Sequence, residues 1–279
     1  MTVLVPMRAA LGFAATVFAS SLSIEACAGD ASPWQRDTHS AVQLLAGSRS
    51  GAVLLGGIAF QLQPGWKTYW RSPGDSGVPP RFDFSKSDNI DAVTVLWPAP
   101  MKFDDGAGGH SLGYHDQFVL PLRIVAKNAE KPVILRAYIS YAVCEKLCIP
   151  VEANAELPFT SVASTEDSML FAALDTVPKP ANVGDPNPLT IRDVKRDGKS
   201  TVLVDVISPD GKDVSLFVEG PTPEWGLPIP EPLNESPPGV KRFAFELEGV
   251  PPGTDPEGAA LKLTLVGADR SYEFNVSLY

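Results

Sequence analysis

Short runs of alternating apolar and polar residues, separated by turn residues, dominate the chain and most constrain its fold. Residues 117–126 and 132–143 alternate with a period of two, which is typical of half-buried strands. Residues 52–63 form an apolar run rich in β-branched and aromatic side chains. The 27 prolines and 23 glycines include dense clusters such as residues 73–77, which predict turns. Short strands between dense turns favour sandwiches over a parallel sheet, so we expect an all-β fold.

The β pattern breaks once along the chain. Residues 164–167 are typical of a helix start, and residues 169–177 supply two or three turns before Pro178 and Pro180 end them. Residues 181–188 are rich in Pro, Asn and Gly and predict a linker. We therefore expect two β-sandwich domains, joined by a short helix and a Pro-rich linker.

A second set of strands is expected after this break. Asp197 and Gly198 separate two β-like runs, and an Asp-Gly pair favours the tight turn of a hairpin. The Pro-rich residues 221–238 predict a long ordered loop. This half has no Cys and no His, so we expect it to be an accessory domain without chemistry of its own. Its further strands are expected at residues 213–219, 241–249, 261–266 and 272–278.

The N-terminus has the pattern of a cleavable export signal. Arg8 precedes an apolar stretch over residues 9–24, and the small residues Ala26 and Ala28 flank Cys27 as in a cleavage site. The alternatives are a lipoprotein signal acylated at Cys27 and a buried N-terminal helix. No later segment is apolar enough to span a bilayer, so we expect a soluble exported protein. The net charge of −10 argues against nucleic acid as a partner.

Cys144 and Cys148 are the only cysteines expected after cleavage, and their spacing predicts a hairpin. On one straight strand, residues four apart are separated by about 13 Å. A disulfide needs Cα atoms about 4.4–6.8 Å apart, so a single strand cannot hold the bridge. If residues 145–147 turn the chain, the two cysteines face each other across a strand pair.

The role of this pair stays open on the residues alone. On the loop-entropy argument, a five-residue loop contributes only about 2 kcal/mol of stability, against about 3 kcal/mol for fifteen residues. A sandwich protein of this size has little need of such a staple, so we favour a redox couple. A structural staple remains an alternative. A metal site that adds His110 and His115 is the other, although their spacing is not a metal signature.

Three stretches of the chain together carry a family resemblance: residues 65–77, GWKTYWRSPGDSG, residues 98–122, and residues 143–150, VCEKLCIP. They resemble parts of the N-terminal periplasmic domain of the thiol:disulfide interchange protein DsbD and the related regions of the ScsB group. The first resembles a conspicuous run of that family, the second the segment with the loop that caps its active site, and the third its redox hairpin. The combination is more specific than a C-x3-C spacing alone.

The resemblance implies a periplasmic oxidoreductase of the protein-disulfide reductase type with an immunoglobulin-like fold. The couple of Cys144 and Cys148 would be reduced by a membrane-embedded partner and would then reduce soluble, periplasmic thioredoxin-like proteins. By analogy with the family, Cys148 forms the mixed disulfide and Cys144 resolves it. No cofactor, metal, nucleic acid or small-molecule substrate is implied.

The expected organisation therefore has four parts. It comprises a signal peptide at residues 1–28, a DsbD-like redox sandwich at 29–163, the helix and linker at 164–188, and an accessory immunoglobulin-like sandwich at 189–279.

The resemblance also marks residues beside the cysteines. Asp104 and Asp105 match acidic positions near the family's site, where a carboxylate could accept a thiol proton or raise a thiol pKa. The family places an aromatic ring over the disulfide, whereas this chain has residues 106–109, GAGG, at that point. Either the pair is more open here or another ring shields it, and the candidates are Trp70, Phe103 and Tyr114. Tyr69 and Trp70 are also candidates to pack beside the sulfurs, although aromatic residues in a strand more often belong to the core.

The family's membrane partner is fused to the C-terminus, whereas this chain ends at Tyr279 after a β-like run. The electron donor is therefore expected to be a separate, DsbD-like membrane protein. Two other functions remain as alternatives. One is a non-catalytic periplasmic protein-binding module with a structural disulfide, and the other is a metal- or haem-handling protein in copper resistance or cytochrome c assembly.

Overall fold

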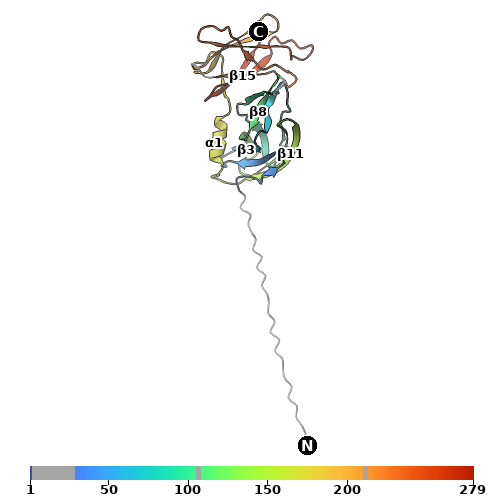
Figure 1. Ribbon diagram of the computed structural model, residues 1–279. Helices are drawn as coiled ribbons and strands as arrows, with labels where there is room; N and C mark the ends of the chain where they lie inside the picture. Colours follow the sequence, from blue (N-terminus) through green and yellow to red (C-terminus); the bar gives the residue numbers. More distant parts are fainter. Residues whose placement is uncertain (2–28, 105–107, 210–212) are drawn as a thin grey trace.

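The computed structural model describes residues 1, 29–104, 108–209 and 213–279, in which the regular secondary structure is strand apart from one short helix (Figure 1). The all-β expectation is confirmed. The expected signal peptide falls on residues 2–28, outside the described residues. In the described part of the chain, no helix has the length and apolar character that crossing a membrane requires.

Two antiparallel sheets, here called the first sheet pair, form the N-terminal part. One has the strand order β1 (Gln35–Arg36), β2 (Ser40–Ala46), β3 (Val53–Leu62), β9 (Gln117–Ala126), β6 (Ile90–Val95). The other has the order β11 (Cys148–Phe159), β10 (Val133–Cys144), β4 (Lys67–Gly74), β8 (His110–His115), β7 (Met101–Asp104), with β5 (Arg81–Asp83) also on β10.

The first sheet pair encloses one hydrophobic cluster. Successive side chains of a strand point to opposite faces, so every second residue enters this core. On β10 the inward residues include Leu135, Ile139 and Val143, none of which is exposed to solvent. The alternation that predicted these strands therefore matches the alternation in burial. The residues between the core residues lie on the other face of the sheet, where they can form a site.

Two further sheets, the second sheet pair, enclose a separate hydrophobic cluster. The third sheet has the order β12 (Lys179–Ala181), β19 (Ser271–Ser277), β18 (Ala260–Val266), β15 (Ser215–Glu219). The fourth has the order β13 (Thr190–Asp197), β14 (Thr201–Ile207), β17 (Lys241–Glu246), β16 (Glu231–Pro232). The predicted Asp-Gly hairpin is present as β13 and β14, with Asp197 paired to Thr201.

Several strands lie where the sequence analysis named none, among them β2, β6 and β8 and the two short strands β12 and β16. β12 follows the predicted helix directly and pairs in parallel with β19. β16 lies within the segment predicted as a long loop and pairs with β17. Each of these two contains a proline, Pro180 or Pro232, and each is an edge strand, where the missing proline N–H leaves no gap in the ladder.

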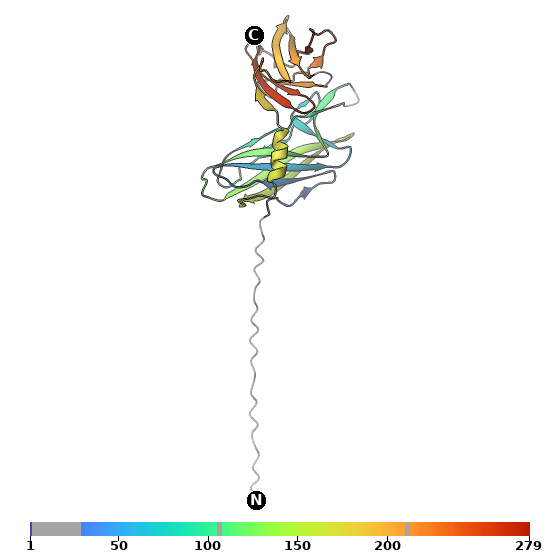
Figure 2. The ribbon, with the colours of Figure 1, turned by 90° about the vertical axis from the view of Figure 1, so that its left-hand side faces the viewer.

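The predicted helix is α1 (Asp167–Asp175), and it packs against the first sheet pair (Figure 2). Its buried residue Leu170 contacts Leu45 and Ala59. Gly57 makes this approach feasible, because a Cβ there would lie 2.7 Å from a methyl carbon of Leu170. Ser48 donates its backbone N–H to Asp167 at 2.8 Å, which fixes the start of the helix.

Candidate functional site

The two cysteines close the tip of the longest hairpin. β10 and β11 pair from Val133 opposite Phe159 to Cys144 opposite Cys148, where a disulfide joins the strands. The two Cα atoms lie 4.2 Å apart, slightly closer than the usual range, and the antiparallel pairing up to the cysteines is the hairpin expected from the spacing. The two sulfur-bearing residues differ in access: Cys144 is only 2% exposed, whereas Cys148 is exposed. The bridge is therefore accessible to solvent from the side of Cys148.

Tyr69 contacts both sulfur atoms. Its hydroxyl oxygen lies 3.0 Å from Sγ of Cys144 and 3.1 Å from Sγ of Cys148. Burial raises the pKa of Tyr69 above its ordinary value, because a buried phenolate loses its hydration. The phenol therefore stays protonated at neutral pH. A hydroxyl has one proton, so it donates to one sulfur at a time and can stabilise whichever sulfur carries negative charge.

The position of Tyr69 follows from its strand and its neighbours. Thr68 donates its hydroxyl to the backbone oxygen of Ala142 at 2.8 Å, which ties β4 to β10 beside the disulfide. Tyr69, Ala142 and Cys144 form a small buried cluster on the face of the sheet that points away from the main core. Gly77 covers the phenol ring. A Cβ there would lie 2.6 Å from two ring carbons, and its φ of +150° also disfavours a side chain.

Lys67 and Phe103 lie next along the same face. Lys67 is the β-ladder partner of both Cys144 and His115. Its ammonium group lies 5.2 Å from the centre of the Phe103 ring and donates to Oγ of Ser111 at 3.0 Å. Phe103 also meets the His115 ring edge-on at 5.9 Å. A positive charge and an aromatic ring therefore adjoin the strand position opposite Cys144.

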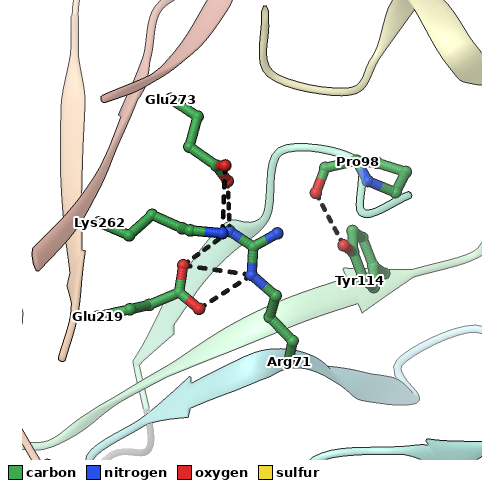
Figure 3. A network of polar contacts seen from close by, with 6 residues as sticks. All are labelled: Arg71, Pro98, Tyr114, Glu219, Lys262 and Glu273. Atoms are coloured by element: carbon green, nitrogen blue, oxygen red, sulfur yellow. Dashed lines mark hydrogen bonds and ion pairs between the residues drawn. The ribbon is translucent and has the colours of Figure 1, made fainter. Parts of the chain in front are cut away.

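Trp70 and Tyr114 lie on the opposite face, in the core of the first sheet pair. Trp70 is fully buried and packs against Phe217 of β15 at a centroid distance of 6.2 Å. The Tyr114 hydroxyl donates to the backbone oxygen of Pro98 at 2.8 Å (Figure 3). Burial raises the pKa of Tyr114 well above its ordinary value, so it stays a donor to this carbonyl. Neither ring therefore lies beside the sulfurs, where Tyr69 lies.

Asp104 lies at the end of β7, where Oδ1 is 2.8 Å from Nδ1 of His110. Its side chain is 82% exposed, so the interaction is screened by water. Asp75 accepts the backbone N–H of His110 at 2.9 Å and holds the same turn. Asp105 lies outside the described residues.

The turn between the cysteines exposes an apolar side chain. Leu147 is 68% exposed, beside Cys148, and Glu145 and Lys146 are exposed as well. Among the residues described, no three His, Cys, Asp or Glu side chains gather as a ligand set. His115 instead lies 2.5 Å from the adjacent Asp116 through Nδ1.

Lys67 and Ala142 were not singled out from the sequence. Both could have been found from the sequence, because each lies two residues from a candidate residue on the same strand and therefore shares its face of the sheet. Lys67 precedes Tyr69 by two positions, and Ala142 precedes Cys144 by two.

Residues 39–160 match the family model described as "Thiol:disulfide interchange protein DsbD, N-terminal". The resemblance predicted from the sequence is confirmed for this part of the chain. No curated protein matches the chain.

Among solved structures, the N-terminal periplasmic domain of ScsB from Proteus mirabilis is similar, with a TM-score of 0.71 at 21% identity. The match covers 90% of this chain and 98% of that one, and at this identity it establishes a shared fold. A conserved domain protein from Bacillus anthracis has a TM-score of 0.24 at 12% identity, over 84% of this chain and 75% of that one, and adds no argument.

Proposed function

We propose that this chain, whose residues 39–160 form a thiol:disulfide interchange domain of the DsbD N-terminal type, carries electrons in the periplasm through Cys144 and Cys148. A membrane-embedded donor of the DsbD kind reduces the pair, and the pair then reduces soluble thioredoxin-like proteins. The activity is that of a protein-disulfide reductase. One observation carries the proposal: within the matched region, the disulfide has one exposed and one buried cysteine.

This asymmetry assigns an order to the exchange. A donor thiolate attacks Sγ of Cys148, the bond between the two sulfurs breaks, and Cys144 leaves as a thiolate that takes a proton. A second donor thiolate then attacks the donor sulfur of the mixed disulfide and releases Cys148. The donor is oxidised to a disulfide, and the pair gains two electrons and two protons.

The reverse half of the cycle uses the same atoms. The Cys148 thiolate attacks the client disulfide and forms a mixed disulfide, and the Cys144 thiolate resolves it. Tyr69 supports both halves, because its O–H can donate to the sulfur that bears charge at each step. Lys67, on the strand position opposite Cys144, adds a positive charge nearby.

The domain organisation is part of the proposal. We assign a signal peptide to residues 1–28, an immunoglobulin-like redox sandwich to residues 29–163, and an accessory sandwich to residues 189–279, with the helix and linker between them. Two hydrophobic clusters support this division, one within each sheet pair, with Phe217 of β15 packed against the first. Export to the periplasm would keep the pair in a compartment where disulfides persist.

A matched pair of single variants tests the assignment of roles. In Cys144→Ser the exposed Cys148 is left free, and in Cys148→Ser the buried Cys144 is left free. We expect Cys144→Ser to form a mixed disulfide with oxidised glutathione on the order of a hundredfold faster, because access limits thiol exchange. Mass spectrometry after acid quenching measures both rates. Equal rates, or no adduct with Cys144→Ser, would contradict the proposal.

A further inference from the structure

The ladder that holds β4 is interrupted directly after the residue that contacts the sulfurs. β4 pairs with β8 at Lys67, Thr68 and Tyr69, and the pairing resumes only at Gly74. Residues 70–73 therefore have no ladder partner on β8 in this register. Contacts other than this ladder must therefore position residues 70–73, directly after Tyr69.

The second sheet pair contacts this interrupted segment. Trp70 packs on Phe217 of β15. Arg71 binds Glu219 of the same strand (Figure 3). Phe217 and Glu219 are two residues apart on one strand, so they share the face of the third sheet that points away from its own core. Glu273, from β19 of the same sheet, is the second carboxylate on Arg71. The third sheet thus contacts the residues of β4 that have no ladder partner on β8.

The contacts of Arg71 are directional. Its Nε lies 2.9 Å from Oε1 of Glu219, and its Nη2 lies 2.7 Å from Oε2 of the same carboxylate. Nη2 also lies 2.6 Å from Oε2 of Glu273, whose Oε1 lies 3.2 Å from Nζ of Lys262. A guanidinium that donates two parallel hydrogen bonds fixes orientation as well as distance, which a lysine ammonium cannot do.

The network is partly shielded from water. The side chains of Arg71, Glu219 and Glu273 are 21%, 17% and 23% exposed. Desolvation opposes the charge of Arg71, but the hydrogen bonds and negative charges of Glu219 and Glu273 outweigh it and raise the pKa of Arg71. Removal of Arg71 would leave two neighbouring carboxylates with only Lys262, so they would separate.

We propose that Arg71 is a positioning residue for the redox couple: anchored by Glu219 and Glu273, it fixes β4 so that the Tyr69 hydroxyl stays against both sulfurs. The second sheet pair thereby influences the disulfide, although it contributes neither cysteine. The functional meaning of this inference rests on the proposed electron-carrier role, whereas the contact itself is testable without it.

The expected direction of the effect follows from the hydrogen bond. A phenol O–H binds a thiolate more strongly than a neutral disulfide sulfur, so it stabilises the reduced form. If β4 loosens, the reduced form loses this contact and the reduction potential falls. Tyr69→Phe should lower the equilibrium constant for reduction by about tenfold, which corresponds to about 30 mV. Arg71→Met should shift it in the same direction by about threefold, because Thr68 still ties β4 to β10.

The control is Arg136→Met on β10. Arg136 also binds two carboxylates, Asp88 and Glu156, at 2.9 and 2.6 Å, but all three lie in the first sheet pair. The equilibrium constant for each folded variant is measured in a dithiothreitol or glutathione series, with circular dichroism as the check on folding. Arg136→Met should leave the constant unchanged. If Arg71→Met does not fold, Arg71→Lys and the double variant Glu219→Gln/Glu273→Gln replace it, with the same expected direction.

A double-mutant cycle tests whether Arg71 acts through Tyr69. Arg71→Met combined with Tyr69→Phe should match Tyr69→Phe alone, because the hydroxyl that Arg71 positions is already gone. Additive shifts, no shift with Arg71→Met, or an equal shift with Arg136→Met would each overturn the inference. A shift of the expected size in a couple that exchanges with no thiol partner would overturn the proposed function and leave the positioning role intact.

Discussion

Both sheet pairs are built mainly from antiparallel strands, but only the strands of the first pair hold the disulfide. In the first pair, β10 and β11 are each 12 residues long and end in a disulfide, with Tyr69 and Lys67 alongside. In the second pair no described strand exceeds 8 residues, and the half after residue 188 has no cysteine or histidine. Its outward face instead presents Phe217, Glu219 and Glu273 to β4. One pair thus holds the reactive atoms, and the other pair contributes contacts that hold them in place.

The largest expected effect comes from removal of the sulfurs. In the chain without residues 1–28, the double variant Cys144→Ser/Cys148→Ser should lose thiol exchange with oxidised glutathione altogether, because no cysteine then remains. Glu219→Gln, a change in the second sheet pair, should keep exchange measurable. Residual exchange in the double variant would break the comparison, since reactive atoms would then lie elsewhere.

The next effect is on stability and belongs to the second sheet pair. Asp205 is 3% exposed and accepts hydrogen bonds from Arg242 at 2.6 and 2.9 Å. Asp205→Asn should destabilise this pair by about 3 kcal/mol, because it leaves a partly buried guanidinium without its counter-charge. Hydrogen exchange of the β14 and β17 amides measures the loss. The equilibrium constant for reduction of the disulfide should change less than twofold.

The same ion pair predicts an acid dependence. The hydrogen bond from Arg242 lowers the pKa of Asp205 below its ordinary value in the folded chain. A carboxyl with a depressed folded pKa stabilises the fold above its unfolded value of about 3.9 and loses that contribution as pH falls through the folded pKa. Protection of the β14 amides should therefore fall below about pH 4 in the parent chain. Asp205→Asn should remove most of that dependence, and an unchanged slope would argue against the pairing.

A smaller effect is expected at the disulfide itself. Tyr69→Phe keeps the ring and removes the hydroxyl that stabilises the reduced form. The equilibrium constant for reduction should therefore fall by about tenfold. Gly77→Ala should act in the same direction, because its Cβ would displace the Tyr69 ring. A dithiothreitol series measures both. If Tyr69→Phe favours the reduced form, the hydroxyl does not act as a donor to the thiolate.

The smallest effect is expected at the exposed acidic residue. Asp104→Asn should change the rate of exchange by less than about twofold, because the charge of an 82% exposed carboxylate is screened. Stopped-flow measurement at low and high salt checks this. A large, salt-dependent effect would instead give Asp104 a direct part in proton transfer.

Sequence patterns predicted the long elements better than the short ones. The hairpin of β10 and β11, the helix and the Asp-Gly turn follow from local alternation and turn chemistry. The edge strands β12 and β16 are only three and two residues long and depend on a neighbour distant in sequence, so no local pattern marks them.

The site shows the same limit. Alternation separates Tyr69 from Trp70, but both are aromatic, so the sequence alone does not tell which of them faces the core. The structure places Trp70 in the core of the first sheet pair, where Phe217, nearly 150 positions later, packs on it. Arg71 could not be selected for a related reason: its carboxylate partners come from strands whose position depends on the packing of the two sheet pairs.

The central claim is that the disulfide of Cys144 and Cys148 is an electron-carrying couple, and its reduction potential tests this most directly. The purified chain without residues 1–28 is equilibrated in glutathione or dithiothreitol mixtures, and the reduced fraction is counted by thiol alkylation and mass spectrometry. We expect a midpoint on the order of −180 to −270 mV, within the range of exchange proteins. A midpoint below about −300 mV would mark a structural bridge and contradict the account.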